Sequence, residues 1–488
     1  MNNRTPGFIA EFPLEASPQA EQALAIRLEA ARHIYNACLG EGLRRLDLVR
    51  QSKDWQRARA MKKSKERTEL FRQTWALFEL FASSLQKYAE RCRDGCWIGH
   101  HLGSHDTQAT SLRAFRAVQQ YAFGKRGRPR FKGRNRVHSI EGKEDAVIRF
   151  LTDPEPAVHW NGLVLRLCLD PRDKHGWQQQ ALACRTKYVR VLRREIKGRT
   201  RWFAQLVQEG AAPQIRKTRE GVVGLDLGPS AIAGVSASDA ILERLCPTVE
   251  QPWRDLRRSE RAMDRSRRAT NPGNFDEHGR AKHGRRQWRR SRRYRVLVQQ
   301  RRERERRLAA ERKRSHGELA NRILGQGKTI QMEDLSYRSF QRNFGRSVKV
   351  RAPGLFVSIL RRRAASGGAE IVDLPTRTTR LSQFDHSTGK YVKKPLHQRM
   401  HVFGSGAIEP VQRDLYSAFL ARCCDKDLLD IRQVHAAWPS AEPLLRRAMA
   451  RMKEPASGPG FALPRVLRSA GAGRPLKRRV RSCEAVDV

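Results

Sequence analysis

Residues 222–236 read VVGLDLGPSAIAGVS, an apolar, glycine-punctuated run typical of a buried strand, yet Asp226 lies near its start. A buried carboxylate costs on the order of several kcal/mol unless a cation, backbone N–H groups or a metal ion compensates it. No Lys or Arg occurs within 222–236. Two local interpretations therefore stay open: Asp226 caps a turn, or it binds a metal ion.

The stretches that follow predict a defined order of elements. IAGVSA and ILERLC are short enough to pair with the first strand as a meander, and the arginine-dominated run to about 323 predicts two helices folded back as a hairpin. GKTIQMEDL then predicts a strand that ends at Glu333. Further on we expect a helix over 353–365, a strand over 369–377 and an amphipathic helix over 411–423 that carries Asp414 early in it.

This order is that of a ribonuclease-H-like fold, in which acids on the first strand, the fourth strand and the last helix converge. Asp226, Glu333 and Asp414 occupy those positions. Three like charges at one point raise one another's pKa and require cations. Two Mg²⁺ ions about 4 Å apart, bridged by such acids, can activate a water and stabilise the leaving oxygen of a phosphodiester. Taken singly, each acid could instead be a surface or capping residue.

The charge of the whole chain indicates the kind of partner. The chain has 488 residues, enough for about three domains, and a net charge of +48 from 98 Lys and Arg against 50 Asp and Glu. Such a chain repels itself unless a polyanion is a regular partner. No apolar stretch approaches the roughly 20 residues of a membrane-spanning helix, and MNNRTPGFIAEF lacks the order of a signal peptide. We expect a cytoplasmic protein that binds nucleic acid and no membrane.

The region before the first acid divides into a helical and a strand-rich part. Apolar spacing predicts helices over 18–125, and the basic, Gly- and Pro-containing stretch 124–139 favours a loop lying against phosphates, with a solvated linker as the alternative. Between 146 and 210 the period changes toward two, and KGRT predicts a hairpin turn between the last two strands. A small antiparallel sheet or barrel is expected there. Nine scattered cysteines favour reduced, buried thiols over a disulfide framework.

Several motifs together resemble a known family. GLDLG, the arginine-rich hairpin, MEDLS and QRDLYSAFLA, in this order, resemble the split RuvC nuclease of the TnpB family and its descendants, the type V CRISPR effectors. EAARHIYNACL, GRPRFK and GRTRWFAQLVQE are similar to segments of the same family further forward, so the resemblance covers about 5–423. It implies an RNA-guided DNA endonuclease with Asp226, Glu333 and Asp414 as metal-binding catalytic acids. It also implies two Mg²⁺ ions, a guide RNA, target double-stranded DNA and a monomeric protein in the RNA complex.

The resemblance also sets the expected domains of this α/β multidomain chain. Residues 1–17 are expected to hold the first barrel strand, 18–139 a helical recognition domain and 140–215 a β-barrel (wedge) domain. A RuvC-like nuclease domain is expected over 216–423, with a target-nucleic-acid-binding insert at 378–405, and a C-terminal helix with a flexible basic tail over 424–488.

Two departures from the family pattern bear on this expectation. Relatives place a four-cysteine zinc ribbon between the second and third motifs, whereas 333–414 contains no cysteine. A rebuilt zinc site could use His386, His397 and His401 with Asp385 nearby, but the neighbouring lysines favour a metal-free, DNA-contacting hairpin. In addition, Leu415 and Tyr416 follow Asp414 where TnpB often has an Asn, which favours a divergent type V effector.

Three functions are therefore compared. The intact set of acids favours an RNA-guided DNA endonuclease. The altered insert keeps a second function open, a guided DNA-binding protein with weak or no cleavage that silences transcription by occupancy. An unguided basic RNA-binding protein would leave the three placed carboxylates unexplained.

Overall fold

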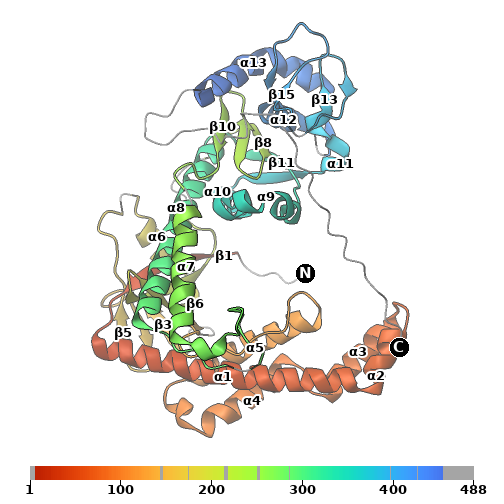
Figure 1. Ribbon diagram of the computed structural model, residues 1–488. Coiled ribbons are helices and arrows are strands. Elements are labelled where there is room, and N and C mark those ends of the chain that lie inside the picture. Colours follow the sequence, from red (N-terminus) through yellow and green to blue (C-terminus); the bar gives the residue numbers. More distant parts are fainter. Residues whose placement is uncertain are drawn as a thin grey trace. The chain divides into compact units, whose positions relative to one another are not determined.

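The computed structural model describes residues 6–142, 147–173, 175–213, 218–249, 253–284, 286–395, 397–425 and 427–453. The chain forms two compact units, each built from three separated stretches (Figure 1). The first unit comprises 1–220, 245–329 and 337–371, and the second comprises 221–244, 330–336 and 372–488. The tail expected after the last helix lies outside the described residues. No helix in the described ranges has the length and apolarity that crossing a membrane requires.

The first unit begins with helices, as the apolar spacing predicted. They are α1 (Pro18–Gln51), α2 (Lys53–Ala60), α3 (Lys65–Leu77), α4 (Ala82–Asp94), the short η1 (Trp97–His100) and α5 (Ser104–Ala122). Helix α1 starts at Ser17, whose hydroxyl accepts a hydrogen bond from the Ala20 N–H at 3.2 Å, with Pro18 at the first helical position. Leu24, Leu28 and other apolar residues of one face are buried, and α1 packs against α4 and α5.

Two antiparallel sheets complete the N-terminal part of this unit. One has the strand order β1-β7-β6-β2 and the other β3-β4-β5. The strands are β1 (Gly7–Leu14), β2 (Ser139–Glu141), β3 (Ile148–Leu151), β4 (Ala157–Trp160), β5 (Leu163–Arg166), β6 (Thr186–Ile196) and β7 (Arg199–Glu209), with α6 (Trp177–Ala183) before β6. The predicted hairpin turn is present: Lys197 and Gly198 both have positive φ, 50° and 77°, as a type I′ turn requires. Strands β2 and β4 and helix α6 were not predicted.

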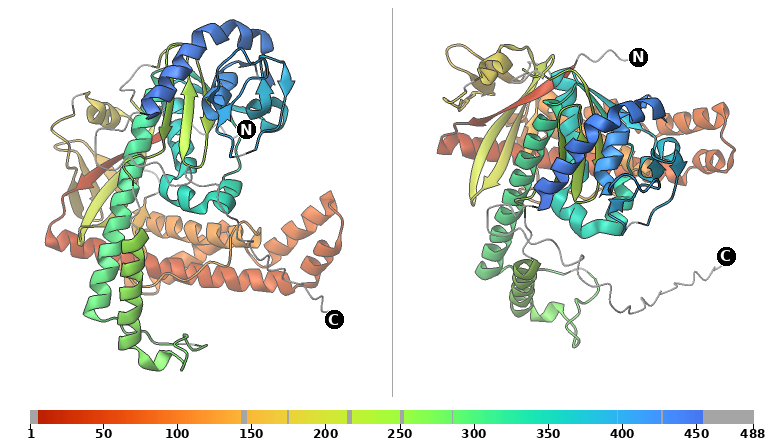
Figure 2. Two further views of the ribbon diagram at one scale, coloured as in Figure 1. Left: turned by 45° about the horizontal axis from the view of Figure 1, so that its top comes forward. Right: turned by 90° about the horizontal axis from the view of Figure 1, so that it is seen from above.

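The arginine-rich segment forms the predicted helical hairpin. Helix α7 (Trp253–Thr270) and helix α8 (Arg292–Leu324) lie side by side, with the short η2 (Pro272–Asn274) in the connection (Figure 2). The helices run antiparallel, because Ser266 bonds Ser291 at 2.8 Å and Glu260 pairs with Arg301 at 3.6 Å further along. Buried residues of α8 fall within 316–324, so its arginine-rich first part is solvated. Helices α9 (Tyr337–Arg351) and α10 (Pro353–Gly367) end the unit.

The second unit is built on a five-stranded sheet of order β10-β9-β8-β11-β12. Strands β8 (Val222–Leu227), β9 (Ala231–Val235) and β10 (Ala240–Arg244) form the predicted antiparallel meander. Strands β11 (Thr329–Glu333) and β12 (Glu370–Leu374) run parallel, because Lys328 bonds Glu370 at their starts and Asp334 bonds Leu374 at their ends. The chain order of these elements is the one expected from the sequence.

Helix α12 (Arg413–Arg422) corrects one expectation, because the predicted amphipathic pattern is wrong. Residues 415–421 are all buried. Strands β8 and β9 pack on one side of α12, while α13 (Ile431–Lys453) and the segment 381–412 contribute to the same core. A helix covered on all sides is apolar all round rather than striped. Segment 381–412 holds η3 (Leu381–Gln383), β13 (Phe384–Asp385), β14 (Lys390–Tyr391), β15 (Met400–His401) and β16 (Val411–Gln412). Helix α11 (Thr376–Thr379) precedes this segment. Strands β17 (Cys424–Asp425) and β18 (Leu428–Leu429) follow α12.

Candidate functional site

The position of Asp226 relative to Asp414 follows from one close approach between β8 and α12. A Cβ atom at Gly224 would come well under 3.0 Å from the Ala418 carbonyl oxygen and the Arg422 backbone nitrogen, so only glycine allows the two backbones to meet there. Asp226 lies on the same face of the strand two residues on, about 6.6 Å away. Asp414 lies about one helical turn, or about 6 Å, before Ala418 along α12. The two carboxylates therefore lie at a similar height along the packed strand and helix.

Glu333 reaches this place from the neighbouring strand. It is the last residue of β11, which lies next to β8 in the sheet. Its side chain is half-buried, and burial raises the pKa of its carboxyl above the usual range. The three predicted acids therefore come from two adjacent strands and the first turn of one helix.

The electrostatics of Asp226 show that the other two acids act on its carboxyl. Burial, followed by the negative charges of Asp414 and Glu333, raises the pKa of the Asp226 carboxyl well above its usual range. The charge of Arg413 and the hydroxyl of Ser417 lower this pKa without offsetting the rise. A cation at this place would reverse the effect, since it would favour the ionised form of all three acids.

Gln412 and Arg413, which lie beside Asp414, were not identified as site residues from the sequence. Gln412 is the N-cap of α12: its side-chain oxygen accepts the Leu415 N–H at 2.8 Å, and its side-chain nitrogen donates to Asp414 at 3.0 Å. Arg413 lies 3.9 Å from the Asp414 carboxylate. The signal that could have revealed them is position, because the residues directly before an acid in a first helical turn are placed to cap the helix and orient the acid.

The donor chemistry of this acid cluster, Asp226, Glu333 and Asp414, suits Mg²⁺, which prefers carboxylate oxygens. Among the described residues, however, no three His, Cys, Asp or Glu side chains are close enough to hold a metal ion between them. Mg²⁺ typically binds through one or two carboxylates together with waters and substrate phosphates, and a closed protein cage is not its usual site. The open cluster therefore fits an ion whose remaining ligands come from water and a phosphodiester.

The cysteine-free insert is organised by side chains that the sequence had singled out as possible zinc ligands. His386 and His401 are buried. The His386 Nδ1 lies 2.8 Å from the Tyr416 hydroxyl, and Lys394 donates to the His401 Nδ1 at 2.6 Å. Burial, followed by the charge of Lys394, lowers the pKa of His401 to about 4, so its ring is neutral near pH 7.

The other two candidate zinc ligands are also placed. Asp385 accepts hydrogen bonds from the Gly404 N–H at 2.8 Å and from the Ser387 hydroxyl at 2.8 Å. His397 is exposed in a turn, whereas His401 belongs to β15, so these two histidines do not share a helix face. A hydrogen-bonded aromatic and histidine core thus occupies the insert, and its freedom from zinc stays a prediction.

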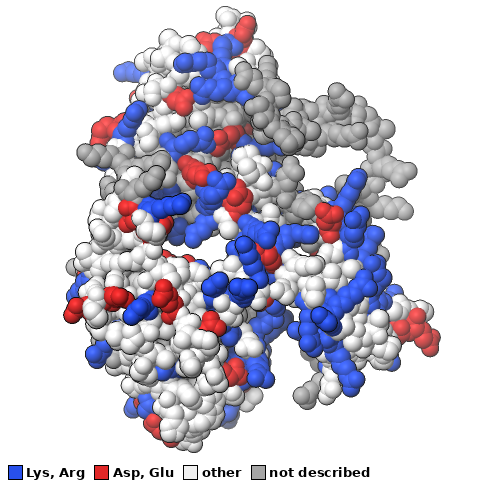
Figure 3. All heavy atoms as spheres, turned by 90° about the vertical axis from the view of Figure 1, so that its left-hand side faces the viewer, with Lys and Arg blue, Asp and Glu red and all other residues white. Residues whose placement is uncertain are grey.

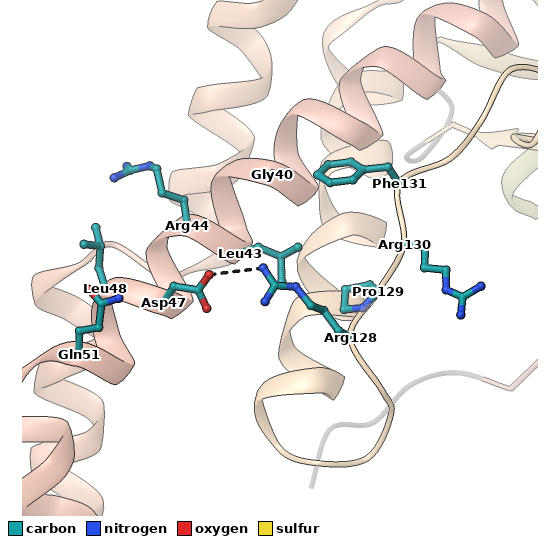
Figure 4. A pocket seen from close by; sticks show the side chains of 10 residues that line it. All are labelled: Gly40, Leu43, Arg44, Asp47, Leu48, Gln51, Arg128, Pro129, Arg130 and Phe131. Carbon is teal, nitrogen blue, oxygen red and sulfur yellow. Dashed lines mark hydrogen bonds and ion pairs between the residues drawn. The ribbon is translucent and has the colours of Figure 1, made fainter. Parts of the chain in front are cut away.

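The basic stretch 124–139 is anchored on α1 by hydrogen bonds, while most of its residues are exposed to solvent. Asn36 of α1 donates to the Lys132 carbonyl at 2.8 Å and accepts the Lys132 N–H at 2.7 Å. A cavity of about 680 Å³ lies between α1 and residues 128–131 (Figure 4). In it the Phe131 ring covers Gly40, and Arg128 reaches Asp47 at 3.4 Å.

Basic side chains of this unit also extend over its surface. Arg130 points away from α1 toward solvent (Figure 4). Figure 3 shows one face of the molecule, on which Lys and Arg side chains gather in groups. An exposed, positively charged surface with aromatic rings among the cations is the kind that nucleic-acid backbones and bases bind.

Two solved structures of known proteins are similar to this chain. No protein-family model matches the chain, and no curated protein matches it. The cryo-EM structure of a Cas12f1–sgRNA–target DNA complex is similar to it at 12% identity and a TM-score of 0.39, covering 85% of this chain and 98% of that chain. The cryo-EM structure of a CRISPR–Cas12f ternary complex is similar at 15% identity and a TM-score of 0.26, covering 82% of this chain and 81% of that chain.

Proposed function

We propose that this chain is a Mg²⁺-dependent, RNA-guided DNA endonuclease whose single RuvC-type site is formed by Asp226, Glu333 and Asp414 on a ribonuclease-H-like sheet. The observation that carries the proposal is the position of Asp226: β8 lies next to β11 and against α12, which places Asp226 near two further carboxylates, whose charges raise its pKa. The charge of Arg413 and the hydroxyl of Ser417 do not offset this effect. Acids gathered in this way serve a site that receives positive charge.

The residues of the chain divide the work at such a site. Asp226 and Glu333 are fixed by adjacent strands, so their separation is set by the sheet. Gln412 orients Asp414 by the hydrogen bond to its carboxylate, and Arg413 limits the negative charge before substrate arrives. When bound, Mg²⁺ supplies an activated water and stabilises the charge on the scissile phosphate.

The partners proposed for the chain are a guide RNA and target double-stranded DNA. A net charge of +48 and the anchored basic segment beside α1 favour polyanionic partners. Of the two similar structures, one is a complex with an sgRNA and target DNA and the other is a ternary complex. In this mechanism, base pairing with the guide selects the target and the protein contributes backbone contacts and the cutting site.

A guided binder without efficient cleavage is the second candidate function. The specific observation in its favour is the insert at 378–405, where a hydrogen-bonded core stands in place of the family's cysteine ligands. That insert normally helps to load DNA into the cleft, so its alteration could leave binding without cutting.

Cleavage of a plasmid by the protein with its guide RNA, in parallel with a gel shift, tests the proposal. Asp226→Ala, Glu333→Ala and Asp414→Ala should each abolish Mg²⁺-dependent cleavage and leave guided binding intact, since the metal chemistry and the backbone contacts use different residues. Asp373→Ala, which removes an acid from the neighbouring strand β12, is the matched control and should keep cleavage. A single acid variant that cuts at the wild-type rate would show that this acid is misassigned, and a wild-type protein that binds without cutting would favour the second function.

A further inference from the structure

Hydrogen bonds hold the described part of the connection between α7 and α8, which forms the tip of the arginine-rich hairpin. Asn271, which is buried, holds it together: its side-chain nitrogen donates to the Arg267 carbonyl at 2.9 Å and the Arg289 carbonyl at 3.0 Å, and its side-chain oxygen accepts the Arg289 N–H at 2.7 Å. Asn274 adds a bond to the Gln287 carbonyl at 2.8 Å. Ser291 then caps α8 by accepting the Tyr294 N–H at 3.1 Å. Residues 287–291 are therefore fixed at both ends.

A cavity of about 200 Å³ opens in this tip, and its lining combines aromatic rings with guanidinium groups. The lining residues are Arg267, Trp288, Arg289, Arg290 and Tyr294. The volume greatly exceeds the roughly 30 Å³ of one water molecule. The Trp288 side chain is 37% exposed, a large open fraction for an indole held by its neighbours.

The ring of Trp288 is positioned by contacts on its face and its edge. The Arg267 guanidinium lies over the ring with 3.9 Å to its centroid, and Phe275 meets the ring edge-on with 5.7 Å between centroids. An indole face and a guanidinium plane are both surfaces on which nucleobases stack. The tip thus presents a stacking surface whose orientation is set before any ligand arrives.

The cations of the tip differ from those further along α8. No carboxylate in the described ranges pairs with the guanidinium groups of Arg267, Arg289 or Arg290, whereas Glu303 pairs with Arg306 at 2.7 Å and with Arg307 at 2.9 Å. The charge at the tip is therefore not neutralised locally. Phosphates are the anions that such forked donors bind well.

We propose that this tip cavity binds an unpaired nucleotide of a nucleic-acid strand, with the base against Trp288 and Tyr294 and the adjoining phosphate on Arg289 and Arg290. A duplex does not fit this chemistry, because its bases are stacked on one another and cannot reach the indole. The proposal concerns binding only and does not depend on cleavage. Single-stranded RNA and single-stranded DNA share the required groups, and the test separates them.

Photo-crosslinking with the full-length protein tests the proposal. A short single-stranded RNA containing 5-iodouridine is irradiated with the protein, and the crosslinked residue is identified by mass spectrometry. We expect the crosslink at Trp288 or Tyr294, and we expect Trp288→Ala to weaken binding of this RNA about tenfold, the effect of losing one stacked base. Trp288→Phe keeps a ring in place and should restore most of the affinity. Competition with unlabelled single-stranded RNA and, separately, with single-stranded DNA shows which of the two occupies the pocket. Either result supports the site.

The controls distinguish this pocket from general attraction to a basic protein. Trp97→Ala removes another exposed indole, on η1, and should leave the affinity unchanged. Arg290→Gln keeps the aromatic surface and should weaken binding while lowering the slope of log K against log salt by about 0.7. The readouts are binding and crosslinking at the tip and not cleavage, so failure of the nuclease proposal and failure of this one are separable. The proposal is overturned if duplex competes as well as single strand, or if Trp288→Ala binds like the wild type and no crosslink maps to the tip.

Discussion

Two acids illustrate how single residues in this chain serve different purposes: Asp106 is fully buried, whereas Asp226 is partly exposed. Asp106 of α5 accepts hydrogen bonds from the Trp160 indole N–H at 3.1 Å and from the Gly103 N–H at 3.3 Å. Arg27 of α1 lies over the same indole, 4.7 Å from its centroid, and donates to the Trp160 carbonyl at 2.6 Å. Asp106 therefore joins the helices to the sheet of β4, whereas Asp226 lies near two other acids whose charges raise its pKa. We expect such neighbours to distinguish a structural role from the metal-binding role proposed for Asp226.

The surroundings of Asp106 predict a pH dependence of stability. Burial raises the pKa of Asp106 from 3.8 to about 6, despite its hydrogen bonds and the charge of Arg27. Because the folded protein binds this proton more tightly than the unfolded chain does, its contribution to stability is complete below about pH 4. That contribution is lost as the pH rises to about 6, by about 3 kcal/mol. Urea unfolding between pH 4 and pH 7 measures it.

Asp106→Asn provides the comparison for this measurement. The amide keeps an acceptor for Trp160 and has no proton to lose, so the free energy of unfolding should no longer fall over this interval. Asp54→Asn in α2 removes a carboxyl at an exposed position and is the control. If the wild type and Asp106→Asn show the same change in stability across the interval, the carboxyl does not titrate in the folded protein as proposed.

The packing of α12 on β8 is the contact between elements that determines the acid cluster. Because a Cβ at position 224 would clash with backbone atoms of α12, which cannot move as a flexible side chain can, Gly224→Ala should separate the helix from the strand. We expect the free energy of unfolding of the second unit to fall by about 3 kcal/mol. DNA cleavage should fall as well, since the shift moves Asp414 away from Asp226. Chemical denaturation and the cleavage assay measure the two effects.

Gly127→Ala is a matched control for this substitution. Nothing lies within 4 Å of a Cβ built at position 127, so the same chemical change there should leave stability unaffected. A Gly224→Ala protein as stable as the wild type would contradict the close approach of the two backbones.

The elements themselves were largely predictable from the sequence, and the contacts between them were not. Alternation and turn chemistry are local, so the β6–β7 hairpin and the β8–β10 meander were correctly predicted. Helix α12 was predicted to have one solvated face because its sequence cannot reveal that α13 and the insert cover it. Strand β4 was missed although its AVHW sequence is mostly apolar, because only pairing with β3 and β5 defines it.

The same contrast holds for the candidate site, whose elements were predictable while the contacts between them were not. The order of Asp226, Glu333 and Asp414 along the chain could be read directly, because each ends or begins an identifiable element. The placement of Asp414 near Asp226 depends on Gly224 and on the cap formed by Gln412, neither of which a spacing pattern reveals. The roles of His386 and His401 could not be anticipated either, since their partners Tyr416 and Lys394 are apposed only by folding.

At the scale of the whole molecule, the arrangement of charge matters more than its sum. Helix α8 carries arginines of two kinds. Some lack an acidic partner in the described part of the chain, and others are paired with glutamates one turn away. The first group comprises Arg292, Arg293, Arg295 and Arg304, and the second comprises Arg301, Arg306, Arg307 and Arg314. Both groups contribute equally to the net charge of +48. The guanidinium charge of the first group is the more readily available for phosphates, because no acid in the described residues competes for it.

This division gives a prediction with a built-in control of equal net charge. Changing the four arginines of the first group to glutamine should lower the slope of log K against log salt for RNA binding by about 3, because each lost single-strand phosphate contact accounts for about 0.7. Changing the four of the second group alters the net charge identically but releases glutamates whose partners are removed, and it should lower the slope far less. Fluorescence anisotropy over a salt series, on protein freed of copurified RNA, gives both slopes. Equal slopes for the two quadruple variants would mean that α8 acts through net charge alone and makes no defined phosphate contacts.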